Sequence, residues 1–67
     1  MDVFAEKLKD LRIEKGLTQG QLAKRTGISR SAITMWEQRT RIPSAVAIIT
    51  LAKFFGVSSD YLLGLED

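Results

Sequence analysis

Residues 17–43, LTQGQLAKRTGISRSAITMWEQRTRIP, contain two short segments with apolar residues at helical intervals, joined by a very short connection. In the second segment Ile33 and Trp36 lie three positions apart, as residues on one helix face do. Only about three or four residues remain for the turn around Gly27, which can adopt the positive φ that a tight connection requires. This spacing predicts a helix-turn-helix geometry.

A pattern typical of helix starts occurs three times in the chain. An apolar residue precedes a hydroxyl residue, and a second apolar residue lies four positions into the helix; the hydroxyl residues are Thr18, Ser29 and Ser58. The hydroxyl can accept a hydrogen bond from the first helical turn, while the apolar pair fixes the angle at which the chain enters. We therefore expect helices to begin at these three residues, with Gln21 completing a capping box at Thr18.

The rest of the chain continues the helical pattern. Turn residues divide it into five short segments, at Gly16, Gly27, Pro43, Gly56 and Gly64. Alternation typical of strands and Asn-Gly hairpin turns are absent from the sequence. We expect an all-α fold in which residues 1–67 form a single domain, either a complete small protein or the N-terminal domain of a longer one.

Composition excludes several classes of function. The 67 residues include no Cys and no His, so disulfides, thiolate nucleophiles, imidazole bases and Cys/His zinc clusters are ruled out. We expect no metal, no cofactor and no enzyme activity. The longest apolar run, Ala45–Ile49, is far below the roughly 20 residues that cross a bilayer, and no signal pattern opens the chain. The sequence thus predicts a cytoplasmic domain with no membrane partner.

The charge distribution favours a polyanionic partner. Residues 24–53 carry six Lys and Arg side chains against Glu37 alone, whereas residues 54–67 are acidic. Within the basic region, Ile33 and Trp36 share one helix face. The opposite face carries mostly short or polar side chains. Hydroxyl, amide and guanidinium groups there can meet base edges or phosphates. The alternatives are a solvated surface and an unspecialised helical hairpin.

Residues 17–43 closely resemble the Cro and phage-repressor (XRE) family of helix-turn-helix DNA-binding domains. The resemblance covers nearly the whole chain, extending to Leu11-Arg12 before this stretch and to Pro43-Ser44, Gly56-Val57-Ser58 and Asp60–Gly64 after it. It implies a compact five-helix, lambda-repressor-like domain. In that family the third helix lies in the major groove of double-stranded DNA, and the second helix begins against the phosphate backbone.

The resemblance also implies roles for individual residues. Expected base contacts are Arg30, Ser31, Thr34 and Met35, and expected phosphate contacts are Gln19, Ser29, Gln38, Arg39 and Arg41. Gln19 would in addition brace the first recognition residue. Arg30 is long enough to grip a guanine edge or to bind only a phosphate, and Met35 can touch a thymine methyl or fill the core. Arg12 and Glu37 match a partly buried structural ion pair, and Trp36 is expected in the core.

Three residues depart from the family pattern. Arg39 stands where the family usually has Gly, so it must adopt an unfavourable φ or the helix must end differently. Gly20 replaces a helix-favouring residue and allows close approach to DNA. Val46 occupies a usually polar position, opposite the core face of its expected helix, with Ile49 beside it and Phe54 on another flank.

These apolar side chains predict a dimer interface made by Val46, Ile49 and Phe54. We interpret the chain as a sequence-specific, non-enzymatic transcriptional regulator, a repressor that occupies a near-palindromic operator as a homodimer. The alternative is a protein-interaction module, such as an antitoxin-like subunit with autoregulatory DNA binding, in which the same apolar surface holds another protein.

Overall fold

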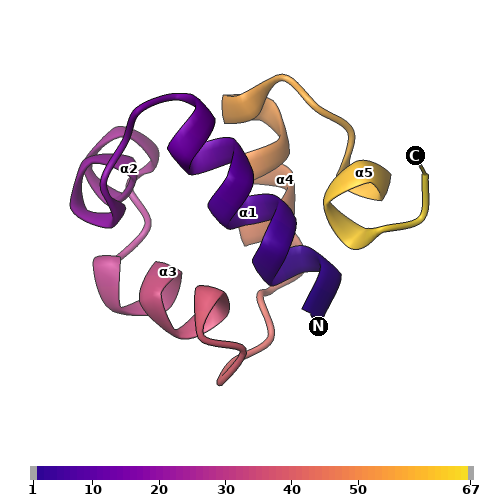
Figure 1. The fold of residues 1–67 in the computed structure, drawn as a ribbon, viewed down its shortest axis with the longest axis horizontal. Coiled ribbons are helices and arrows are strands. Elements are labelled where there is room, and N and C mark those ends of the chain that lie inside the picture. The colour runs from indigo at the N-terminus through magenta and orange to yellow at the C-terminus, as the bar shows by residue number, and fades with distance from the viewer. Residues whose placement is uncertain (1, 67) are drawn as a thin grey trace.

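A computed structural model describes residues 2–66, which form five helices and no strand. The helices are α1 (Asp2–Glu14), α2 (Gln19–Thr26), α3 (Arg30–Glu37), α4 (Ala45–Phe55) and α5 (Ser59–Leu63). In Figure 1, α1 crosses the middle of the molecule, with α2 and α3 towards one end and α5 at the other. The expected all-α, five-helix architecture is confirmed. Within residues 2–66, every helix is too short or too polar to span a lipid bilayer.

The helices begin where the hydroxyl pattern predicts. Thr18, Ser29 and Ser58 are the N-caps of α2, α3 and α5, and each side chain accepts a hydrogen bond from the backbone N–H three residues on. At Thr18 the capping box is complete, because Gln21 Oε1 also accepts from the Thr18 N–H over 2.9 Å. Ser44 caps α4 in the same way. The helix starts expected from the sequence are therefore confirmed.

The connection between α2 and α3 is the predicted tight turn. Gly27 ends α2 in the left-handed conformation, with φ 76°, and its N–H donates to the carbonyl of Ala23 over 2.9 Å. Ser29 then caps α3 two residues later. An L side chain at position 27 would be strained at this φ. Glycine thus permits α3 to follow α2 directly in a helix-turn-helix.

Every helix contributes to one core. Its fully buried large side chains are Phe4, Leu8, Leu22, Ile33, Leu51 and Leu62. Trp36 is 7% exposed and meets the ring of Phe4 edge to face, with centroids 6.1 Å apart. The expectation that Trp36 is a core residue is confirmed, and the contact ties α3 to α1.

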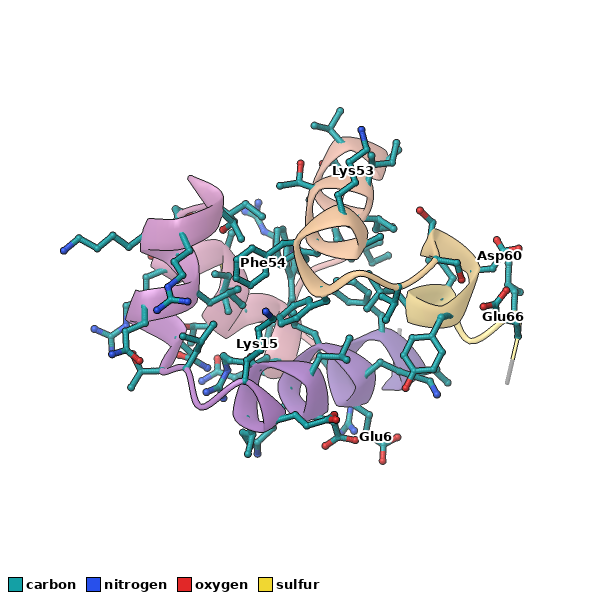
Figure 2. The ribbon with its side chains drawn as sticks, turned by 90° about the horizontal axis from the view of Figure 1, so that it is seen from above. Glu6, Lys15, Lys53, Phe54, Asp60 and Glu66 are labelled. Atoms are coloured by element: carbon teal, nitrogen blue, oxygen red, sulfur yellow. The ribbon has the colours of Figure 1, made fainter. Side chains whose placement is uncertain are left out.

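Phe54 is not exposed, contrary to the sequence expectation. It is half-buried, packs on the core and meets Phe55 edge to face, at 5.1 Å between ring centroids. Lys15 Nζ lies 5.1 Å from the centre of the Phe54 ring, and Figure 2 shows these two side chains together. A helical-wheel projection of α4 shows which way Phe54 points. It does not show that Lys15, just after α1, lies beside it. Val46 and Ile49 are exposed, as expected.

Arg39 adopts the conformation that the family usually assigns to glycine. Its φ is 65°, the only positive φ of a non-glycine residue in the described chain. The Thr40 N–H donates to the Met35 carbonyl and the Arg39 N–H to the Trp36 carbonyl, the two hydrogen bonds of a Schellman motif. Of the two possibilities open from the sequence, the unfavourable φ is therefore the one adopted.

Arg39→Gly is expected to raise the free energy of unfolding by about 1 kcal/mol, because glycine removes the steric cost of the left-handed conformation. Gln38→Gly is the matched control, since Gln38 has φ −83° and gains nothing from glycine. Urea denaturation of both variants measures the difference. A less stable Arg39→Gly protein would show that the contacts of the arginine side chain outweigh the strain.

Candidate nucleic-acid interface

The outer face of α3 carries the residues expected to meet bases. Arg30 and Ser31 are exposed and Thr34 and Met35 are half-buried, while Ile33 on the opposite face is fully buried. This division follows from the 100° step of a helix, which places positions 31, 34 and 35 away from position 33. Arg30 is exposed because it lies at the start of α3. The face offers donors, acceptors and a thioether within one helix of eight residues.

Gln19 connects the start of α2 to this face. Its Nε2 donates to Glu37 Oε1 over 3.1 Å, and its Oε1 accepts from Thr34 Oγ1 over 2.7 Å. The residue of α3 that Gln19 braces is thus Thr34, and not Arg30 at the start of the helix. Sequence reasoning missed this partner because a side chain at the start of α2 can reach several positions on α3, and only the turn geometry decides which.

An almost buried ion pair anchors the same cluster. Arg12 Nε and Nη2 donate to the two oxygens of Glu37 over 2.8 and 2.9 Å, and Arg12 Nη1 donates to the Leu17 carbonyl over 2.8 Å. The side chains are only 12% and 5% exposed. Hydrogen bonding to Glu37 raises the pKa of the Arg12 guanidinium above its ordinary value, although burial opposes the rise. The pair joins α1 to the end of α3.

Further polar and basic side chains surround α3. The exposed residues are Ser29 before the helix and Gln38, Arg39 and Arg41 after it. At the far end of the molecule Asp60 and Glu66 lie around α5, away from α2 and α3 (Figures 1 and 2). The uneven charge along the chain therefore becomes an uneven charge in space, and the end with α3 is the one suited to an anionic partner.

Gly20 lies beside the side chain of Arg30. A Cβ built at position 20 would be 3.9 Å from Arg30 Cδ and 4.0 Å from Thr18 Oγ1, both ordinary contacts. The isolated domain therefore has room for alanine at this position. The glycine, which costs helix stability, has no explanation within the chain itself.

The expected dimer residues lie apart from this face, on α4. Val46 is 74% exposed and Ile49 is 48% exposed. Ile42, just before α4, is also exposed, at 73%. Sequence reasoning missed Ile42 because it lies before Pro43 and the N-cap Ser44, where helical spacing does not apply.

The chain belongs to the XRE-type helix-turn-helix family. The model of the family described as "Helix-turn-helix" matches residues 8–62. It is a family of DNA-binding regulators and not of enzymes, so the interpretation of this domain as a non-enzymatic DNA-binding one is confirmed.

Similar proteins carry regulatory names. Over 64 residues the chain is 44% identical to the HTH-type transcriptional activator BcrR of Enterococcus faecalis, covering 96% of this chain and 31% of that protein. It is 34% identical over 55 residues to the cryptic phage CTXphi transcriptional repressor RstR of Vibrio cholerae, covering 82% of this chain and 50% of that protein. An uncharacterized HTH-type transcriptional regulator of Methanocaldococcus jannaschii is 41% identical over 61 residues, covering 91% of this chain and 92% of that protein. The chain spans less than two thirds of the length of most of the relatives it matches, BcrR and RstR included.

Glu37→Gln is expected to lower the free energy of unfolding by about 3 kcal/mol, because it leaves the nearly buried guanidinium of Arg12 without its counter-charge. Glu14→Gln, on the exposed surface of α1, makes the same chemical change and should shift stability by no more than about 0.5 kcal/mol. Equal effects of the two substitutions in urea denaturation would contradict a structural role for the pair.

Proposed function

We propose that this domain is a sequence-specific transcriptional regulator that inserts α3 into the major groove of double-stranded DNA. The observation that carries the proposal is the polar outer face of α3, fixed to α1 by Arg12 and Glu37 and to α2 by Gln19. A rigidly held helix with short hydroxyls and one guanidinium suits readout of base edges.

Within this proposal, base contacts come from Arg30, Ser31, Thr34 and Met35. The exposed Arg30 can hold O6 and N7 of one guanine with two parallel hydrogen bonds. Ser31 hydrogen-bonds a base edge, and Met35 contacts a thymine methyl with its half-buried side chain.

The DNA backbone is held on either side of α3. Proposed phosphate contacts are Gln19, Ser29, Gln38, Arg39 and Arg41. Nε2 of Gln19 has two hydrogens, and the bond to Glu37 uses one of them. Gly20, which the fold itself does not need, lets the backbone approach the first turn of α2. These contacts set register and general affinity, and base contacts set preference.

Arg30→Ala is expected to reduce preference at one base pair per half-site by about 1–3 kcal/mol, through loss of the guanine contact. Selection of bound sequences from random DNA, followed by titration of single-base variants, measures this. Arg25→Ala removes an exposed guanidinium from α2 and should leave the selected sequence unchanged. An equal loss of affinity for every sequence in Arg30→Ala would identify Arg30 as a phosphate contact instead.

We further propose that the domain acts as a homodimer through α4. Val46 and Ile49 supply exposed apolar surface on α4, the exposed Ile42 before α4 would enlarge it, and the half-buried Phe54 is the third proposed member. Two-fold pairing would present two copies of α3 to successive major grooves about 34–36 Å apart, so the operator is a near-palindrome with half-sites about 10 base pairs apart.

Val46→Glu is expected to weaken both dimerisation and binding to the palindromic site, because it places a charge within the apolar contact. Sedimentation of the wild type and the variant, with and without selected DNA, measures assembly. Ile13→Glu is the matched control, since Ile13 is 56% exposed on α1. A wild-type monomer on a single, non-repeated site would contradict the proposal, and unchanged assembly in Val46→Glu would remove this surface of α4 from it.

We propose that the domain represses transcription by occupying its operator, since this needs only DNA binding and dimerisation. The proposed site of action is the cytoplasm. One similar protein is named an activator and another a repressor, so repression rather than activation is itself part of the proposal. A second candidate is an antitoxin-like interaction module, favoured by the same exposed Val46 and Ile42. Salt-dependent binding with a clear base preference would support the regulator over the interaction module.

A further inference from the structure

Four side chains form a hydrogen-bond chain whose donors all converge on Glu37. Thr34 Oγ1 donates to Gln19 Oε1 over 2.7 Å, and Gln19 Nε2 donates to Glu37 Oε1 over 3.1 Å. Glu37 in turn accepts two hydrogen bonds from Arg12. From the outer face of α3 the donors of Thr34 and Gln19 point inwards, and the donors of Arg12 meet them at Glu37, which only accepts.

The buried end of this chain fixes the orientation of the Gln19 amide. The Glu37 carboxylate is an acceptor only, since the doubly bonded Arg12 guanidinium stabilises its charge. An amide oxygen turned towards that carboxylate would repel it, so the Gln19 NH2 group must face Glu37. The Gln19 carbonyl oxygen consequently faces Thr34 and requires a donor from it.

The Thr34 hydroxyl has one hydrogen, and Gln19 uses it. For any further partner Thr34 Oγ1 therefore has lone pairs only. Ser31 differs, because its exposed hydroxyl makes no hydrogen bond to the described part of the chain and can turn to donate or to accept.

Resting on the proposed DNA readout, we propose that Thr34 is an obligate hydrogen-bond acceptor that selects an amino group in the major groove. Adenine N6 and cytosine N4 carry such groups, whereas guanine O6 and thymine O4 present acceptors at the corresponding places. Donating to those acceptors would take the hydrogen from Gln19 Oε1 and leave that oxygen without its partner. Thr34 is thus a specificity-determining residue, and Gln19, Glu37 and Arg12 are positioning residues that set its polarity.

The first test uses the wild type and Thr34→Val, which keeps the side-chain shape but has no hydroxyl. Selection from random DNA should show one position per half-site at which the wild type prefers adenine or cytosine and Thr34→Val has lost that preference. At this position, replacing adenine by purine, or cytosine by 2-pyrimidinone, removes only the exocyclic amino group. Wild-type affinity should fall about fivefold to tenfold more than that of Thr34→Val. If adenine is selected, 7-deazaadenine should be bound as well as adenine.

The second test uses Gln19→Ala, which frees the hydroxyl hydrogen of Thr34. Guanine and thymine should then be accepted at the Thr34 position, while the base read by Arg30 is unchanged. Gln21→Ala, on the same helix, is the matched control and should not broaden that position. A general loss of affinity without broadening would indicate that Gln19 acts only on phosphate or stability, and would overturn the polarity role.

The remaining outcomes separate this inference from the proposed function. A preference for guanine or thymine at the Thr34 position, sensitivity to 7-deazaadenine without sensitivity to loss of the amino group, or an unchanged selected sequence in Thr34→Val would overturn the inference alone. A wild type with no base preference at any position would overturn the proposed function itself. The base-analogue measurements on the wild type do not depend on how well any variant folds.

Discussion

The ion pair between Arg12 and Glu37 is the interaction on which both the fold and the candidate interface depend. A buried ion pair gains little net free energy, because removing two charges from water costs nearly as much as their attraction provides. Its contribution here is geometric. The guanidinium fork fixes both carboxylate oxygens and also holds the Leu17 carbonyl, so α1, the chain entering α2 and the end of α3 have one mutual arrangement. Through Gln19 the same arrangement reaches the surface and orients Thr34.

Two residues near α3 are unfavourable for their own backbone conformation. Gly20 lies in a helix with room for a Cβ, and Arg39 occupies a left-handed conformation that glycine would adopt without strain. Local unfavourable choices of this kind concentrate at functional sites, where an external partner compensates for them. The two positions flank the outer face of α3, at the start of α2 and after the end of α3. Their placement supports a partner that contacts both ends of that face.

The elements of the fold could be predicted from sequence because their signals are local. The three hydroxyl caps, including Thr18 and Ser29, depend on residues within one helical turn, and the inward direction of Trp36 depends only on helical spacing. Contacts between elements were less accessible. Phe54 packs on the core and lies beside Lys15, and the partner of Gln19 depends on how tightly α2 turns into α3. Hydrogen-bond direction was least accessible, because it follows from the whole chain of donors and not from any pair of residue types.

The proposed recognition of two half-sites at a fixed spacing would require α3 and α4 to move as one body. Ile33 on α3 and Leu51 on α4 are fully buried in the same core, which resists relative displacement of the two helices. The intervening residues are anchored at both ends, by the Schellman motif around Arg39 and by the buried Pro43. The left-handed turn at Arg39 therefore directs the chain from α3 towards α4, in addition to placing a cation beside α3. In a dimer formed through α4, this turn would help to fix the distance between the two copies of α3, and with it the spacing of the half-sites.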